Sequence, residues 1–268
     1  MERLDYKVYS TGSSALDNLF GGYKTRTLIE FFGLTEAGKT TLGVYIPIMS
    51  IWKDMQSNDG EDGQFLVIDC DESFDEERFE QILVNNNIDP EPVFERIILF
   101  RPTGFGEQHK IITKEIPEII KNGIVPKFIT IDAICSHYRG AILRSPGRFK
   151  LAEIGEKTGK LDMQLNYIRG IAHKYNCPST VVTWEGSNLE IGETQNQKDG
   201  NKVASDLGTI GGRAMQFLPK VVVHLKMVTK LSPLREAVLV KHRSKPVGQT
   251  ARFTLCDGGI KDVVASGR

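Results

Sequence analysis

The sequence lacks any long apolar run. The chain of 268 residues is 40% hydrophobic and 25% charged, and no stretch approaches the roughly 18 uncharged residues that a membrane-spanning helix needs. The charged residues at 1–7 are followed by no hydrophobic stretch, so they do not form a secretory signal. We therefore expect a cytoplasmic globular protein with no membrane partner.

Closely spaced cysteines are also missing. The four cysteines, Cys70, Cys135, Cys177 and Cys256, lie far apart and form no C-x-x-C pair. This spacing argues against a zinc site or a disulfide framework and favours buried thiols in a reducing compartment. The five histidines show no metal-ligand spacing, and no G-x-S-x-G elbow is present, so a hydrolase triad has no support.

The chain has no net charge, because 34 basic residues balance 34 acidic ones. Zero net charge normally argues against a nucleic-acid-binding protein. The signs are unevenly distributed, however: residues 54–96 hold 14 acids and two bases, and residues 213–245 hold eight Lys or Arg and one Glu. Two interpretations stay open, namely solvated helix faces of opposite sign, or a dipolar surface for head-to-tail self-association or a basic groove.

Short apolar runs alternate with helical patterns over most of the chain. The runs typical of strands lie at 27–32, 65–70, 97–100, 128–132 and 179–183, and the helical patterns at 39–52, 76–86, 109–121 and 161–175. This alternation predicts an α/β fold with a mostly parallel central sheet and helices on both faces.

The pattern changes after Gly211. Three closely spaced runs at 220–226, 237–241 and 250–255 predict an antiparallel edge to the sheet. Two stretches, 139–160 and 185–210, lack good periodicity, and irregular segments of this length inside a compact domain are usually functional or disordered.

A glycine-rich segment carries the clearest chemistry. Residues 33–40 read GLTEAGKT, which fits the P-loop pattern G-x-x-x-x-G-K-S/T between a strand and a helix. Its backbone N–H groups would surround phosphates at the start of the helix. Lys39 would reach the β- and γ-phosphates, and the Thr40 hydroxyl would bind Mg²⁺. The predicted nucleotide-binding residues are Gly33, Leu34, Thr35, Glu36, Ala37, Gly38, Lys39, Thr40 and Thr41.

A P-loop needs a second carboxylate near the metal ion. The apolar run at 128–132 ends in Asp132. A lone acid at the end of a strand is often only a helix cap, but beside a P-loop we expect Asp132 to hold Mg²⁺ together with Thr40.

The order and spacing of several further motifs resemble the RecA/RadA recombinase family, and within it the archaeal RadA paralogues of the RadB type. The matching segments are STGSSALDNLFGG at 10–22, IDCDESF at 68–74 with Glu77 and Arg78 after it, NNIDP at 86–90, GEQH at 106–109, Asp132 with HYR at 137–139, IGG at 210–212 and KHRSKP at 241–246. The resemblance covers residues 10–263.

The resemblance implies a RecA-like P-loop ATPase that uses ATP and Mg²⁺. In such enzymes a carboxylate at the end of the second strand polarises the attacking water, and this position falls on Asp71, where RadA proteins carry Glu. Asp is one methylene shorter, so we expect a slow, DNA-dependent ATPase activity with Asp71 as the base. Glu72 is the alternative. The family's amide sensor after its fifth strand is replaced here by Trp184 and Glu185.

The resemblance also implies two cations that act on a neighbouring subunit. Lys241 and Arg243 lie at i and i+2, and on one strand they would face the same way. In RecA-like assemblies a K-x-R pair reaches the neighbour's ATP site and neutralises developing charge. The alternative is that both are exposed strand charges.

By the same resemblance, residues 139–160 and 185–210 are the DNA-binding loops. The first holds six bases, Arg139, Arg144, Arg148, Lys150, Lys157 and Lys160, against two acids, which suits a phosphate backbone; a merely solvated loop is the alternative. The second carries a net charge of −3 and has no aromatic residue between Glu185 and Ile210 that could stack on a base, so it is a poor DNA-binding loop.

Only nine residues precede Ser10. We therefore expect one RecA-like ATPase domain over 1–268, with neither the helix-hairpin-helix domain nor the interprotomer plug of RadA. The predicted function is that of a recombinase paralogue in homologous recombination and DNA repair, which binds ATP and single-stranded DNA and assists a RadA-type recombinase. The expected protein partner is a RadA-type recombinase or a further copy of this chain. The alternatives are a nucleotide-gated mediator without useful catalysis and a KaiC-like or helicase-like ATPase.

Overall fold

The fold is built on a ten-stranded sheet. The computed structural model describes residues 6–57, 62–143, 150–187, 207–209 and 212–263. The strands of this sheet are β3 (Leu28–Gly33), β4 (Gln64–Asp69), β5 (Ile97–Phe100), β6 (Pro126–Asp132), β7 (Ser179–Ser187), β8 (Leu207–Thr209), β9 (Val221–Met227), β10 (Leu234–Lys241), β11 (Thr250–Cys256) and β12 (Gly259–Asp262). The short strands β1 (Val8–Tyr9) and β2 (Tyr23–Lys24) pair separately.

The strand order is β12-β11-β10-β9-β3-β7-β6-β4-β5, and β8 pairs with β7. Strands β9, β3, β7, β6, β4 and β5 run parallel, whereas β10, β11 and β12 continue the sheet antiparallel. Every residue of β3 is buried, as expected for a parallel strand covered on both faces. The predicted α/β fold with an antiparallel C-terminal edge is therefore confirmed.

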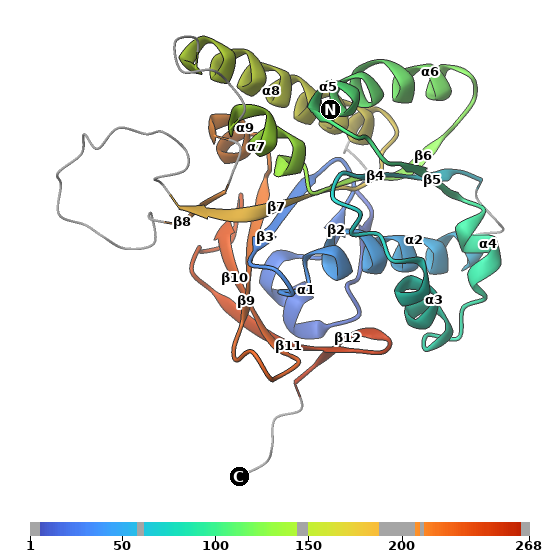
Figure 1. Cartoon of the computed structure of the whole chain (residues 1–268). Helices are drawn as coiled ribbons and strands as arrows, with labels where there is room; N and C mark the ends of the chain where they lie inside the picture. The colour runs from blue at the N-terminus through green and yellow to red at the C-terminus, as the bar shows by residue number, and fades with distance from the viewer. Residues whose placement is uncertain (1–5, 58–61, 144–149, 188–206, 210–211, 264–268) are drawn as a thin grey trace, which may run out of the picture.

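Helices cover both faces of this sheet (Figure 1). One hydrophobic core lies under α1 (Ser14–Phe20), α2 (Ile46–Ser57), α3 (Glu76–Val84) and α4 (Pro90–Phe94). The other lies under α5 (Phe105–Lys110), α6 (Ile116–Lys121), α7 (Cys135–Leu143), α8 (Lys150–Lys174) and α9 (Gly212–Phe217). Two π-helical turns, η1 (Thr41–Tyr45) and η2 (Ile111–Glu115), lead into α2 and α6. Within the described residues, no helix is long and apolar enough to cross a bilayer.

Helix α3 shows how local sequence sets these elements. Asp75 stands before its first turn in an extended conformation and accepts a hydrogen bond from the backbone N–H of Arg78, which satisfies a donor that the helix leaves free. Phe79, Ile82 and Leu83 are buried and share one helix face at i, i+3 and i+4.

The expectation of an irregular segment at 139–160 is wrong. Helix α7 runs to Leu143 and helix α8 begins at Lys150, so only 144–149 lie outside the described residues. The helix is hard to predict there because Gly155 and Gly159, which lie on its exposed face, are poor helix formers. In the second irregular stretch, β7 extends to Ser187 and pairs with β8, and 188–206 lie outside the described residues.

Candidate nucleotide-binding site

The P-loop connects the end of β3 to η1 at the carboxyl edge of the parallel strands. Gly33 has φ 155° and Gly38 has φ 92°, conformations that glycine adopts without steric cost. A Cβ at Gly33 would lie 2.2 Å from the Leu225 carbonyl oxygen on β9, so no larger residue fits there. Glu36, which is not a glycine, also has a positive φ of 64°, in the left-handed region.

The two predicted metal ligands lie side by side. The Thr40 hydroxyl donates a hydrogen bond of 2.6 Å to Oδ2 of Asp132. Asp132 is the last residue of β6, is only 3% exposed, and pairs in register with Asp69 of β4. A hydroxyl and a carboxylate held at this distance are the donors that Mg²⁺ takes up beside nucleotide phosphates. The described residues contain no cluster of three or more His, Cys, Asp or Glu suited to a metal.

The charges around this pair affect one another. Burial, followed by the nearby Asp71 carboxylate, raises the pKa of Asp132 to about 7. Burial lowers the pKa of Lys39, and Asp132, Asp71 and Glu185 oppose that shift. Lys39 Nζ donates a 2.7 Å hydrogen bond to the Leu34 carbonyl within the loop. The site thus brings one ammonium group and several carboxylates together in a poorly solvated place.

The two candidates for the base, Asp71 and Glu72, differ in their surroundings. Oδ1 of Asp71 is buried and has no hydrogen-bond partner among the described residues, and Asp71 acts electrostatically on both Asp132 and Lys39. Glu72 has φ 57° and is exposed. Asp69 is engaged elsewhere, because it accepts a 2.9 Å hydrogen bond from the backbone N–H of Ser73. Of these carboxylates, Asp71 has an oxygen without a partner and also acts electrostatically on Lys39 of the P-loop.

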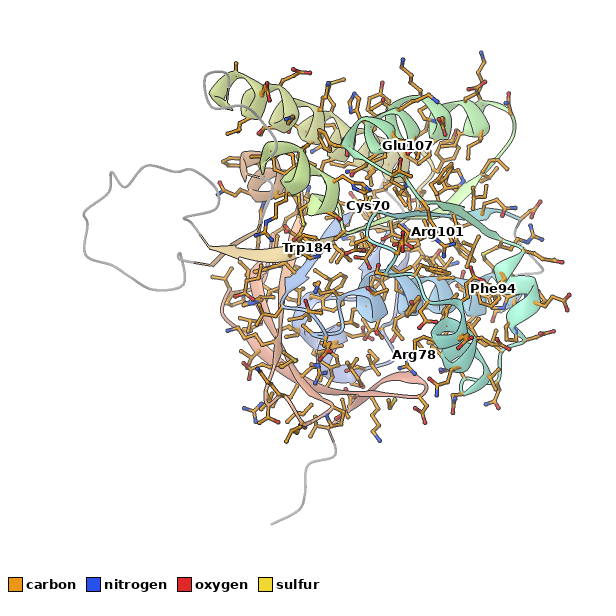
Figure 2. The ribbon with its side chains drawn as sticks, in the orientation of Figure 1. Cys70, Arg78, Phe94, Arg101, Glu107 and Trp184 are labelled. Atoms are coloured by element: carbon orange, nitrogen blue, oxygen red, sulfur yellow. The ribbon has the colours of Figure 1, made fainter. Side chains whose placement is uncertain are left out.

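A cavity of about 570 Å³ opens beside the loop. It is lined by Glu36, Gly38, Lys39, Thr40, Thr41, Tyr45, Ser73, Asp75, Arg78, Arg235 and Leu255. Figure 2 labels Arg78, which donates a 2.6 Å hydrogen bond to the Cys256 carbonyl and so joins α3 to the end of β11. Arg235 was not predicted to line this cavity, because an arginine in a strand such as LREAVLVK resembles an ordinary outward-facing charge.

The end of β7 holds a second polar group near the P-loop. Oε2 of Glu185 lies 3.1 Å from Nε2 of His224 on β9, and the His224 ring stacks on Phe32 at 4.4 Å. Burial lowers the pKa of His224, and Glu185 opposes this shift. The backbone N–H of Trp184 donates to Cys135 Sγ at 3.3 Å. Trp184 and Glu185, which occupy the expected sensor position, are thus both engaged with other residues of the chain. The contact of Glu185 with His224 was not predicted from the sequence.

Lys241 and Arg243 lie far from the chain's own P-loop. Lys241 pairs with Val222 near the start of β9, whereas the P-loop follows Gly33, which pairs with Leu225. The expectation that one strand carries both cations is wrong, because β10 ends at Lys241. The chain turns there: Nδ1 of His242 accepts hydrogen bonds from the backbone N–H groups of Ser244 and Lys245, both at 3.1 Å. Lys241 Nζ donates to the Gln216 carbonyl at 2.6 Å.

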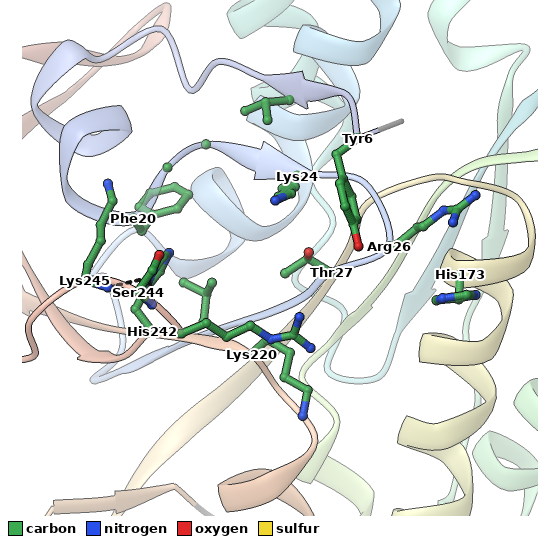
Figure 3. A pocket seen from close by; sticks show the side chains of 15 residues that line it. Tyr6, Phe20, Lys24, Arg26, Thr27, His173, Lys220, His242, Ser244 and Lys245 are labelled. Carbon is green, nitrogen blue, oxygen red and sulfur yellow. Dashed lines mark hydrogen bonds between the residues drawn. The ribbon is translucent and has the colours of Figure 1, made fainter. Parts of the chain in front are cut away.

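A basic pocket of about 410 Å³ lies where β3 and β9 begin, and Arg243 is among the residues that line it. Figure 3 shows this pocket from close by. Its titratable side chains are Tyr6, Lys24, Arg26, His173, Lys220, His242, Arg243 and Lys245, and its lining contains no acid. Three of its cations, Lys220, Arg243 and Lys245, belong to the basic segment at 213–245.

The predicted DNA-binding residues are only partly described. Arg139 lies in α7; Arg144, Arg148 and the side chain of Lys150 lie outside the described residues. Two further cations of the segment are engaged in ion pairs along α8, since Lys157 contacts Glu153 at 3.4 Å and Lys160 contacts Glu156 at 2.6 Å.

Comparisons with known proteins show the family to which the chain belongs. The Rad51 family model matches residues 3–263. The DNA repair and recombination protein RadB of Thermococcus onnurineus is 27% identical over 96% of this chain and 98% of its own length, and that of Thermococcus kodakarensis is 28% identical over 96% and 100%. A crystal structure of the RadB recombinase superposes with a TM-score of 0.71 at 26% identity, covering 96% of this chain and all of that one. The chain therefore belongs to the Rad51 family, and it is RadB-like over nearly its whole length.

Proposed function

We propose that this chain is a RadB-like recombinase paralogue of DNA recombination and repair that binds ATP with Mg²⁺ and hydrolyses ATP slowly. The observation that carries this proposal is the 2.6 Å contact between Thr40 and Asp132 at the mouth of the P-loop, with the unpartnered Asp71 oxygen beside it. The RadB relatives support the biological role.

Each residue of the site has a distinct task in this proposal. Lys39 exchanges the Leu34 carbonyl for the phosphates of the nucleotide. Thr40 and Asp132 hold Mg²⁺, which neutralises phosphate charge when it is bound. Asp71 accepts a hydrogen bond from the attacking water and orients it. Hydrolysis is slow because the short Asp71 side chain reaches this water less well than a glutamate would.

Lys241 and Arg243 act on the neighbouring subunit. Both lie at the opposite end of the sheet from the chain's own P-loop, so neither reaches the nucleotide bound by the same chain. A head-to-tail contact would bring them to the neighbour's phosphates. The neighbour is either a second copy or a RadA-type recombinase, and single-stranded DNA is bound through residues 139–150.

A mediator without useful catalysis is the second candidate. The observation that favours it is the Glu185–His224 contact of 3.1 Å, since an acid held in this way does not offer the γ-phosphate the hydrogen bonds of an amide. Steady-state ATPase with and without single-stranded DNA separates the two functions: a slow ATPase is stimulated by DNA, and a mediator is not.

Calorimetric titration with ATP and Mg²⁺ tests the proposed function directly. The wild-type chain should bind one nucleotide, and Lys39→Ala should weaken binding at least about 100-fold, because it removes a charged phosphate contact in a site shielded from water. Lys53→Ala, an exposed lysine of α2, is the matched control and should bind as the wild type does. Absence of saturable binding by the wild type would refute the proposal.

A further inference from the structure

Arg235 is a buried arginine in the wall of the nucleotide cavity. It lies near the start of β10 between Met227 of β9 and Phe253 of β11. Its exposed fraction is 8%, and it lines the same cavity as Lys39 and Thr40. Buried arginines are rare unless their charge is compensated, so this position requires an explanation.

The guanidinium donates only to backbone carbonyls. Nε donates to the Glu36 carbonyl at 3.0 Å, and Nη1 donates to those of Ser232 at 2.6 Å and Leu234 at 3.1 Å. Among the described residues, no carboxylate forms an ion pair with Arg235, and Nη2 donates to no protein group. A guanidinium has five N–H donors, and the two on Nη2 are left over beside the cavity. An uncompensated cation with spare donors is suited to an anion that arrives from outside.

The contact with Glu36 ties Arg235 to the P-loop itself. Glu36 has a left-handed backbone conformation, with φ 64°, which a non-glycine residue keeps only when its surroundings hold it. The hydrogen bond from Arg235 fixes the Glu36 carbonyl. Leu255 of β11 packs against the next glycine of the loop, since its Cδ2 would lie 3.2 Å from a Cβ on Gly38. The antiparallel strands therefore support the P-loop from the side.

We propose that Arg235 is a phosphate-binding residue of the nucleotide site: Nε and Nη1 hold the P-loop and the β9–β10 turn in place, and Nη2 donates to the phosphates. This inference rests on the proposed nucleotide binding and adds a cation that comes from the same chain. It differs in this respect from Lys241 and Arg243, which serve a neighbour. The ligand class is a di- or triphosphate.

Calorimetric titration of the full chain with Mg²⁺ and either ATP or inorganic triphosphate tests this assignment. Arg235→Gln should weaken the binding of both ligands by about tenfold or more, because charge-assisted hydrogen bonds are lost. Arg235→Lys keeps the charge but not the carbonyl contacts, and it should weaken both by about threefold. Arg252→Gln removes an exposed arginine of β11 paired with Glu236 and should leave both affinities within about twofold of wild type.

Two results would overturn the inference. One is an Arg235→Gln variant that binds triphosphate within twofold of wild type. The other is a loss of ATP affinity with unchanged triphosphate affinity, which would assign the guanidinium to the base or sugar. If thermal unfolding shows that Arg235→Gln does not fold, the folded Arg235→Lys variant decides, and unchanged triphosphate affinity then overturns the inference.

A second measurement isolates the effect on the loop. Amide hydrogen exchange at 35–38 in the nucleotide-free chain should be faster in Arg235→Lys than in wild type, and unchanged in Arg252→Gln. Equal exchange in all three would contradict the support of the P-loop. The failure of nucleotide binding as a whole is recognised separately: in that case the wild type and Lys39→Ala behave alike, whatever the state of Arg235.

Discussion

Asp132 shows how a buried carboxylate affects stability. Burial and Asp71 raise its pKa in the folded chain to about 7, from 3.8 in an exposed carboxyl. Between these values the folded state binds more protons than the unfolded state, so this group makes the nucleotide-free chain less stable as the pH rises toward 7. The cost is complete above pH 7 and absent below about pH 4.

Replacing Asp132 tests this linkage. Asp132→Asn keeps the size of the side chain and has no charge to desolvate, so it should raise the melting temperature of the metal-free chain more at pH 8 than at pH 5. Thermal unfolding in the presence of a chelator measures both values. Asp62→Asn, at an exposed acid, is the control and should show no such difference. An equal effect of Asp132→Asn at the two pH values would contradict the raised pKa.

Asp71 is the residue on which hydrolysis depends in the proposed function. Asp71→Asn should lower the ATPase rate at least about 100-fold, because the loss of a general base costs this much, and should leave the affinity for ATP close to wild type. Glu72→Gln should leave the rate within about twofold, since Glu72 is exposed. A rate that falls in Glu72→Gln and not in Asp71→Asn would exchange the two roles.

At the scale of elements, helix α8 carries glycines that its structure does not require. A Cβ at Gly155 or Gly159 would meet no atom within 4 Å, and neither residue has a positive φ. Gly159→Ala should therefore stabilise the chain by about 0.5–1 kcal/mol. Gly33→Ala is the contrasting variant and should destabilise it, because its Cβ would meet the Leu225 carbonyl. Urea unfolding gives both values, and a less stable Gly159→Ala would contradict the helical assignment.

The strands and the second half of α8 were predictable from the sequence, and the first turns of α8 were not. A buried parallel strand such as β4 holds an unbroken apolar run, FLVI at 65–68, which is typical of strands covered on both faces. The first turns of α8 combine glycines with charged residues, and the resemblance assigned them to a DNA-binding loop. The apolar run at 237–241 matches the end of β10, but placing Arg243 on the same strand as Lys241 was wrong. The turn after Lys241 depends on hydrogen bonds that His242 accepts from the backbone, and no spacing of residues reveals them.

The predictable part of the site is the part that is local in sequence. Lys39 and Thr40 belong to one motif, and Asp132 ends an apolar strand. Arg235 and His224 reach the site through strand register alone: His224 pairs with Phe32, one residue before Gly33. Such contacts depend on the order of strands in the sheet, which periodicity does not give.

At the scale of the whole molecule, the nucleotide site and the two cations Lys241 and Arg243 lie at opposite ends of the parallel strands. Lys241 and Arg243 lie at the end where β9 begins, and the P-loop lies at the other. In the proposed function, in which Lys241 and Arg243 act on a neighbour, the nucleotide site is completed only in a head-to-tail assembly, because a heterologous contact joins unlike ends. Hydrolysis should therefore rise more steeply than linearly with protein concentration.

Mixing two inactive variants tests this arrangement. Lys39→Ala cannot bind ATP but still offers Lys241 and Arg243, whereas the double variant Lys241→Ala, Arg243→Ala binds ATP but offers nothing to its neighbour. Each alone should hydrolyse ATP at a small fraction of the wild-type rate. An equal mixture should recover about a quarter of that rate, since about a quarter of the sites in a randomly mixed head-to-tail assembly are complete.

The control for the mixture removes two cations from elsewhere. The double variant Lys114→Ala, Lys121→Ala changes exposed lysines of η2 and α6 and should hydrolyse ATP like the wild type when alone. Light scattering must show that the mixed chains assemble. If they assemble and the mixture stays inactive, or if the Lys241, Arg243 variant is fully active alone, the two cations do not serve a neighbouring site, and catalysis is confined to the residues around the P-loop.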